Sequence, residues 1–168
     1  MKALVKYFLL SAVFFFYQLG KSNAQKVSLI TLDQLEHRID SGKDTVFIVN
    51  FWATWCTPCI EEIPYFQQLF NTQPDPVTKL IFVSLDSPTK IDSLVKPFIK
   101  KHHITNEVYV LNEQNQQKYI EQIDPDWSGA IPATLFITSG GEKRLFFEQS
   151  FDFQALEDTF LSFKRKFR

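Results

Sequence analysis

Hydrophobic residues recur along the chain with two different periods, and the alternation predicts strands connected by helices. Nearly continuous apolar runs at 45–51 and 79–85 are typical of strands buried on both faces of a sheet, and 107–111 is a shorter run of the same kind. Apolar residues at helical spacing follow the first two runs, at 60–70 and 91–99. We therefore expect a sheet whose neighbouring strands are joined by helices.

Capping residues and prolines mark the ends of the predicted helices. Thr31 and Gln34 have the spacing of a capping box, and they begin a short amphipathic helix that ends at 41–42. Pro88 suits the first turn of the helix predicted around 91–99, because the N–H that proline lacks is not needed there. Pro64 falls inside a helical pattern, where we expect it to kink or restart the helix.

The last third of the chain follows a different pattern. Residues 114–123 are polar and predicted to be helical, whereas 132–137 and 144–147 flank a glycine turn and predict a β-hairpin. A final helix over 153–167 carries a stripe of leucine and phenylalanine. Strands that alternate with helices, followed by a hairpin and a helix, predict one α/β domain with a sheet of mixed direction.

Composition excludes several classes of protein. A chain of 168 residues that is 45% hydrophobic can bury a core of ordinary size without a disulfide framework. Eighteen basic residues balance 19 acidic ones, which argues against a broad basic surface for nucleic acid. The charged and aromatic fractions, 22% and 15%, argue against a disordered chain. Two cysteines are too few for a four-thiolate zinc site, and we expect no cofactor.

The first residues have the layout of a secretory signal peptide. Two lysines precede an apolar stretch at 7–19, and small residues precede a cleavage point after Ala24. The apolar stretch is shorter than the ~20 residues of a membrane-spanning helix, but an uncleaved anchor that tethers the protein to the membrane is the alternative. We expect a signal peptide at 1–24, a folded domain at 25–168, and export to the periplasm or cell envelope.

The two cysteines lie three positions apart, where the strand predicted at 45–51 passes into a helix. A thiol in the first turn of a helix faces unpaired backbone N–H groups and the positive end of the helix dipole, which stabilise its thiolate. Cys56 is therefore the predicted nucleophile, and Cys59, one turn further along, is the predicted resolving thiol. Half of a metal site and a purely structural disulfide are the alternatives, although a disulfide that closes so few residues removes little unfolded-chain entropy.

Two motifs carry a family resemblance: WATWCTPC at 52–59 and IPAT at 131–134. Together they resemble the thioredoxin superfamily, and specifically its secreted TlpA/ResA/CcmG-like branch. The resemblance implies a thioredoxin-like fold, with a central mixed sheet flanked by helices and an added segment between Leu85 and the proline loop. It also implies that Pro132 is a cis-proline facing the cysteines and that Ile131 offers backbone groups to a bound peptide. The alternative is that Pro132 begins an edge strand.

Two further positions bear on proton transfer. Cytoplasmic thioredoxins carry a buried aspartate six residues before the nucleophile, where this chain has Asn50, which does not titrate. Glu62 instead matches the position at which the TlpA/ResA-like branch places a carboxylate near its cysteines. A buried carboxylate there would raise the pKa of the thiols and could accept the proton of Cys59. The alternative is that Glu62 is an exposed helix residue beside Glu61.

Two tryptophans lie within the first motif and one precedes the second, and together they could form an apolar rim for an extended polypeptide. We expect Trp52 to be mainly structural, and Trp55 to be partly exposed at the site and to contact the substrate together with Thr57 and Pro58. For Trp127 a core position and a place on the rim are both open.

These features predict an exported thiol:disulfide oxidoreductase. Cys56 would attack a disulfide of a protein substrate, and Cys59 would resolve the mixed disulfide. The resemblance implies the reducing direction, in work that includes preparing apocytochrome c for haem attachment, and a membrane or periplasmic electron donor. One alternative is a peroxiredoxin-like peroxidase, whose chemistry needs a threonine shortly before its cysteine. The other is a non-catalytic module that holds clients or a metal through the cysteine pair.

Overall fold

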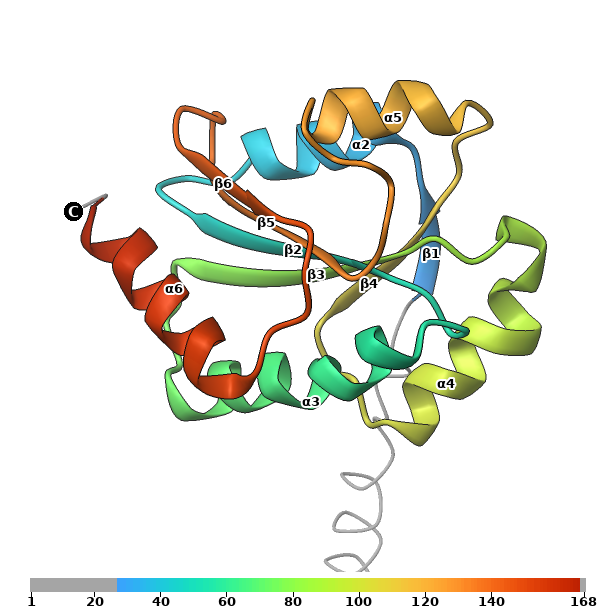
Figure 1. Ribbon diagram of the computed structural model, residues 1–168, viewed down its shortest axis with the longest axis horizontal. Coiled ribbons are helices and arrows are strands. Elements are labelled where there is room, and N and C mark those ends of the chain that lie inside the picture. The colour runs from blue at the N-terminus through green and yellow to red at the C-terminus, as the bar shows by residue number, and fades with distance from the viewer. Residues whose placement is uncertain (1–26, 167–168) are drawn as a thin grey trace, which may run out of the picture.

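The computed structural model describes residues 27–166, which form a six-stranded sheet with helices on both faces (Figure 1). The signal peptide predicted at 1–24 lies outside the described residues. Within residues 27–166 no helix has the length and apolar character needed to cross a membrane. The elements are β1 (Val27–Ile30), α2 (Leu32–Asp40), β2 (Val46–Trp52), α3 (Thr57–Thr72), β3 (Thr78–Ser84), α4 (Lys96–Lys101), β4 (Glu107–Leu111), α5 (Gln116–Ile123), β5 (Ala133–Thr138), β6 (Arg144–Phe147) and α6 (Phe153–Arg165).

The sheet has the strand order β1-β4-β3-β2-β5-β6. The first four strands in this order are parallel, whereas β5 runs antiparallel to β2 and β6 antiparallel to β5. The predicted mixed sheet is therefore confirmed. Strand β4, with helices α4 and α5 beside it in sequence, lies between Leu85 and the proline loop, where the resemblance implies an added segment, and in the sheet β4 lies between β1 and β3.

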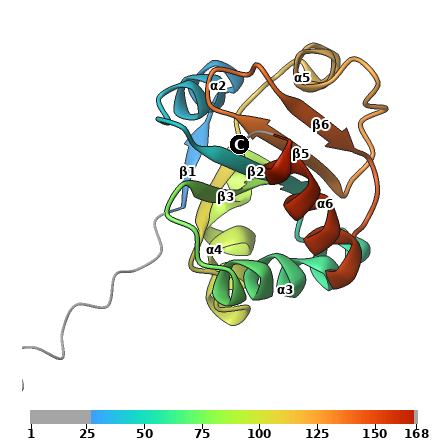
Figure 2. The same cartoon turned by 90° about the vertical axis from the view of Figure 1, so that its left-hand side faces the viewer.

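Helices α2 and α5 cover one face of the sheet, and α3, α4 and α6 cover the other (Figures 1 and 2). The buried side chains form two corresponding clusters. Successive residues of β2 alternate between them, with Phe51 on the α2 side and Ile48 and Trp52 on the α3 side. Asn50 has the parity of Ile48 and Trp52, so its side chain faces α3. Every residue of β2 is buried because the strand is central and covered on both faces.

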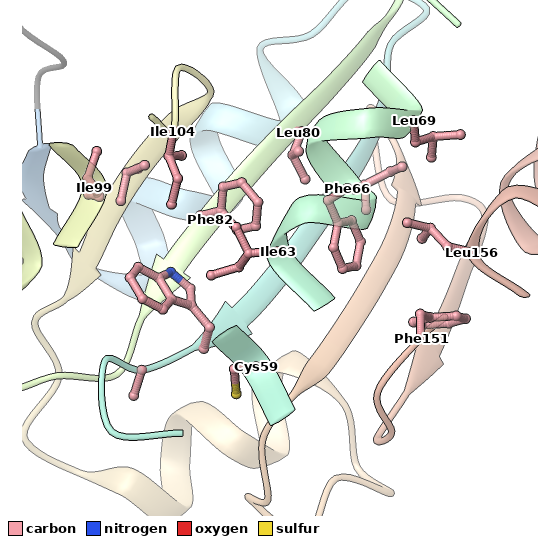
Figure 3. Packing of buried hydrophobic residues seen from close by; sticks show 14 of the residues in the cluster. Cys59, Ile63, Phe66, Leu69, Leu80, Phe82, Ile99, Ile104, Phe151 and Leu156 are labelled. Carbon is pink, nitrogen blue, oxygen red and sulfur yellow. The ribbon is translucent and has the colours of Figure 1, made fainter. Parts of the chain in front are cut away.

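Helix α3 carries the cysteine pair and is fixed to the sheet by its own apolar face. Cys59 and Phe66 lie on the buried face of this helix, and the ring of Phe66 packs against that of Phe82 on β3, with ring centroids 6.1 Å apart (Figure 3). The spacing of these buried positions along α3 follows the helical period. Because the same face carries both a cysteine and core residues, the packing of α3 holds the cysteine pair at a defined place above the sheet.

The helix that the sequence predicts after Pro88 is divided into three parts. It consists of a 3₁₀ turn at Pro88–Lys90, a π-helical turn at Ile91–Val95, and α4. Pro97 explains the division, because it lacks the N–H that an α-helical hydrogen bond requires. The N–H of Lys96 instead reaches five residues back to the first carbonyl of the π-helical turn. Pro64, in contrast, lies inside α3 and does not restart it.

Candidate active site

Cys56 and Cys59 lie where β2 passes into α3. Cys56 is the N-cap residue of α3, and Cys59 lies in its first turn. The two residues form a disulfide with an S–S distance of 2.04 Å and a Cα–Cα distance of 5.3 Å. The backbone N–H of Cys59 donates to Cys56 Sγ at 3.3 Å. A backbone donor at the start of the helix therefore already points at the sulfur that is predicted to become a thiolate.

The two cysteines differ in how far solvent reaches them. Cys56 is 5% exposed, whereas Cys59 is 0% exposed. Thr57 and Pro58, between them in sequence, are exposed, and Trp55 is 68% exposed. A substrate disulfide can therefore approach Cys56 from solvent, whereas Cys59 has no surface that solvent or substrate can contact. The two sulfurs thus differ in solvent access, and their roles as nucleophile and resolving thiol stay predictions.

The tryptophans at the first motif have the two environments that were predicted. Trp52 is 0% exposed and packs against Phe98, with ring centroids 4.9 Å apart. Trp55 projects into solvent directly beside Cys56. Trp52 therefore belongs to the core beneath the site, and Trp55 belongs to its surface.

The second motif lies against the first. The peptide bond between Ile131 and Pro132 is cis, as the resemblance implies. The carbonyl oxygen of Ile131 lies 3.6 Å from Cys56 Sγ. Pro132 is buried and directly precedes β5, which lies between β2 and β6. The alternative of a proline at the start of an edge strand is therefore wrong.

The loop before the cis-proline is held by Trp127. Its indole N–H donates to the carbonyl of Ala130 at 2.8 Å, and its ring packs 5.1 Å from the ring of Phe51. Trp127 is 4% exposed, so it is a core residue and does not form part of a surface rim. Gly129 has a positive φ of 92°, and a Cβ there would lie 2.7 Å from the side chain of Ile120. The close packing of this loop positions the Ile131 backbone beside the disulfide.

Glu62 is buried, with an exposed fraction of 1%. The alternative of an exposed residue beside Glu61 is therefore wrong. The Glu62 carboxyl group accepts the backbone N–H of Phe151 at 2.8 Å and the side-chain amide of Asn50 at 2.7 Å. Burial raises the pKa of Glu62 from 4.5 to about 7, against the smaller lowering effect of these two hydrogen bonds. This carboxyl group can therefore gain or lose a proton near neutral pH.

Asn50 connects three elements beneath the cysteines. Its amide nitrogen donates to Glu62 on α3 and, at 3.1 Å, to the hydroxyl of Thr134 on β5. Its amide oxygen is buried and has no hydrogen-bond partner. Sequence reasoning did not identify the contributions of Thr134 and Phe151. Thr134 lies within the IPAT motif, but Phe151 contributes a backbone N–H, for which no side-chain pattern exists.

Comparison with known proteins identifies the family of this chain. The sequence matches the AhpC/TSA family over residues 21–143. It is 31% identical over 111 residues to the thiol-disulfide oxidoreductase ResA of Oceanobacillus iheyensis, covering 66% of this chain and 53% of that protein. The sporulation thiol-disulfide oxidoreductase A of Bacillus subtilis is 28% identical over 95 residues, covering 56% and 54% respectively. The chain thus spans about half the length of these two curated relatives.

Solved structures share the fold. The thioredoxin-related protein from Neisseria meningitidis serogroup B superposes with a TM-score of 0.62 at 22% identity, over 74% of this chain and 89% of that one. StoA from Bacillus subtilis superposes with a TM-score of 0.54 at 25% identity, over 70% of this chain and 84% of that one. The predicted thioredoxin-like fold is therefore confirmed.

Proposed function

The chain belongs to the AhpC/TSA family as a TlpA/ResA-like member of the thioredoxin superfamily, and from that membership we propose that it is a thiol-disulfide oxidoreductase. One observation carries this proposal. Cys56 and Cys59 form a disulfide at the start of α3, and Cys56 Sγ lies 3.6 Å from the carbonyl of Ile131, beside the cis-proline. The site thus combines a redox-active pair with backbone groups that a polypeptide substrate can use.

The reaction begins with both thiols reduced. The Cys56 thiolate attacks one sulfur of a substrate disulfide, the substrate S–S bond breaks, and one substrate cysteine leaves as a thiolate that takes up a proton. Cys59 then loses its proton and attacks Cys56 Sγ, which releases the second substrate thiolate and forms the enzyme disulfide. Two electrons pass from the enzyme dithiol to the substrate, and a donor dithiol must return them before the next cycle.

Glu62 is proposed as the acceptor of the Cys59 proton. The two residues lie one turn apart on the buried face of α3. Burial raises the pKa of Glu62 to about 7, so the carboxylate is a stronger base than an exposed glutamate. Cys59 itself is 0% exposed and has no direct route to bulk water. A buried base next to a buried thiol is therefore the simplest way to form the resolving thiolate.

The substrate is proposed to be an extended segment of a protein that contains a disulfide. Trp55, Thr57 and Pro58 form the exposed surface around Cys56, and Ile131 and Pro132 form its other side. The backbone groups of Ile131 are proposed to pair with a substrate backbone in the manner of an added strand. The exposed Trp55 ring can cover apolar substrate side chains.

Export is proposed from the signal-peptide layout of residues 1–24, with cleavage after Ala24 or retention as a membrane anchor. We propose reduction as the direction, and a membrane or periplasmic dithiol protein as the electron donor. Apocytochrome c is a candidate substrate. Equilibration of the cysteine pair with glutathione tests the direction, because a reduction potential well above about −150 mV would indicate an oxidase instead.

Client trapping is the direct test of the mechanism. Cys59→Ser should leave the nucleophile intact and stop resolution, so that protein adducts linked through Cys56 accumulate in the native compartment and disappear on treatment with a reductant. The double variant Cys56→Ser, Cys59→Ser is the matched control and should trap nothing. Absence of adducts from Cys59→Ser, with the variant folded and Cys56 reactive toward iodoacetamide, would exclude the reductase mechanism.

Peroxidase activity is the second candidate, and Thr54 bears on it. Thr54 is the nearest threonine before Cys56, and its hydroxyl donates its hydrogen bond to Asp86 at 2.7 Å. Disulfide reduction is therefore the better-supported activity. Consumption of hydrogen peroxide by the reduced protein, compared with reduction of a protein disulfide, separates the two activities.

The remaining alternative is a module that holds clients or a metal through the pair. In residues 27–166 no group of three or more His, Cys, Asp or Glu side chains is arranged as a metal site, so in this region such a module would rely on the two thiols. Zinc or copper retained stoichiometrically through purification would favour that alternative.

A further inference from the structure

A second buried carboxyl group lies beside the cysteine loop. Among residues 27–166, Glu62 and Asp86 are the carboxylic acids with buried side chains, and Asp86 is 3% exposed. Asp86 follows the carboxyl end of β3, next to the end of β2 from which the cysteine loop departs. Neither the proposed proton transfer nor substrate binding uses it, so its burial requires another explanation.

Asp86 binds the loop through Thr54. Its Oδ2 accepts the backbone N–H of Thr54 at 2.9 Å, and its Oδ1 accepts the hydroxyl of Thr54 at 2.7 Å. The hydroxyl of Ser84 donates to the same carboxyl group at 2.7 Å and accepts the backbone N–H of Asp86 at 3.0 Å. Three donors that converge on one acceptor hold the carboxyl group in a single orientation.

Thr54 lies in the turn that delivers the nucleophile. The backbone N–H of Cys56 donates to the carbonyl of Ala53 at 3.1 Å, so Thr54 and Trp55 form the central positions of a tight turn. Trp55 at the outside of this turn is 68% exposed and offers it little support. Within the turn, the contact with Asp86 is therefore the principal side-chain connection between the loop and the sheet.

We propose that Asp86 is a positioning residue that holds Thr54 so that Cys56 stays at the start of α3 when the disulfide is open. In the oxidised protein the covalent bond to Cys59 already fixes Cys56. In the dithiol form that bond is absent, and the turn must be held by noncovalent contacts. This proposal rests on the proposed function, because the dithiol form is the one that attacks a substrate.

The test removes the side-chain hydrogen bond of the connection, while the carboxylate and its hydrogen bond to the backbone N–H of Thr54 stay in place. Thr54→Val replaces the hydroxyl with a methyl group and changes no charge. Asp86→Asn would also remove a negative charge, and this removal by itself favours the Cys56 thiolate. In the Cys59→Ser background, Cys56 is the one remaining thiol of the chain, and its alkylation by iodoacetamide reports its thiolate fraction. We expect Thr54→Val to slow alkylation at pH 7 about threefold, because a Cys56 that is displaced from the start of α3 loses part of the stabilisation of its thiolate.

The chain offers two matched controls. Thr54→Ser keeps the hydroxyl and should alkylate at the parent rate. Thr78→Val removes a threonine hydroxyl that donates to Asp75 at 3.2 Å, at the opposite end of β3, and should also alkylate at the parent rate. The thermal unfolding temperature of the oxidised protein should fall by a similar amount in Thr54→Val and Thr78→Val. This comparison separates an effect on Cys56 from general destabilisation.

Three outcomes would overturn the proposal: an unchanged alkylation rate in Thr54→Val, an equal slowing in Thr54→Ser, or an equal slowing in Thr78→Val. Because alkylation needs no protein substrate, these outcomes are distinct from failure of the proposed function. A parent protein that has an accessible Cys56 thiolate but reduces no protein disulfide would contradict the proposed function. The alkylation rates of the variants would still decide the positioning proposal.

Discussion

The side-chain amide of Asn50 donates a 2.7 Å hydrogen bond to the carboxyl group of Glu62, in a part of the core where neither side chain is more than 1% exposed. An amide does not titrate, so in this pair the proton is carried by Glu62 alone. Asn50 also has a buried amide oxygen without a partner, on the other side of the same group. Rotation of the amide would present that oxygen as an acceptor, which suits a protonated Glu62.

Glu62→Gln should remove a pH dependence of stability. The pKa of Glu62 is about 7 in the folded protein and 4.5 in the reference state, so its contribution to stability is fully present below pH 4.5 and is lost as the pH rises through about 7. The free energy of unfolding of the oxidised protein should therefore fall by on the order of 2 kcal/mol between pH 5 and pH 8. In Glu62→Gln this decrease should disappear, as measured by urea unfolding at both pH values.

Glu61→Gln is the matched control for this measurement, because Glu61 is the exposed neighbour on the same helix. It should retain the decrease in stability. A Glu62→Gln variant that loses as much stability between pH 5 and pH 8 as the parent protein would show that Glu62 does not titrate in this range.

Asn50→Asp should create a pair of carboxyl groups that cannot both ionise. The new group would lie at hydrogen-bond distance from Glu62, and like charges this close share one proton over a wide pH range. We expect the variant to be destabilised more at pH 8 than at pH 5, by on the order of 3 kcal/mol. Asn115→Asp adds the same charge at the exposed N-cap of α5 and should be close to neutral. Equal stability changes at both pH values would contradict the prediction.

The two tryptophans of the first motif should respond oppositely to truncation. Trp55→Ala removes an exposed ring, so the free energy of unfolding should change by less than about 0.5 kcal/mol, while KM for a protein disulfide rises. Trp52→Ala removes a fully buried ring and should cost about 3–5 kcal/mol. Urea unfolding combined with steady-state kinetics measures both effects. An unchanged KM in Trp55→Ala would remove Trp55 from the substrate surface.

The central strands could be predicted closely because their signal is local. The runs at 45–51 and 79–85 differ from β2 and β3 by one residue at each end. Strand β1 could not be predicted in this way. It has four residues with a mixed burial pattern, and its register is set by pairing Val27 with Val108 of β4, far along the chain.

In the candidate site, too, the residues with a local signal could be predicted and the contacts between distant segments could not. The cysteine pair belongs to a short motif that can be found in the sequence, whereas the cis form of Pro132 follows from the family resemblance that its motif carries. The partners of Glu62 are not readable, because Phe151 contributes only a backbone N–H from a distant segment. The location of Asp86 could have been predicted, because polar residues after the carboxyl ends of adjacent parallel strands meet at one edge of the sheet. Its partner Thr54 lies 32 residues away, and only the fold brings the two together.

The most direct test of the account is reduction of insulin disulfides by the parent protein and by Cys56→Ser, with dithiothreitol as the electron source. The account predicts that the parent protein accelerates insulin precipitation over the reductant alone and that Cys56→Ser gives the rate of the reductant alone. A folded parent protein without activity, or a Cys56→Ser variant as active as the parent, would contradict it.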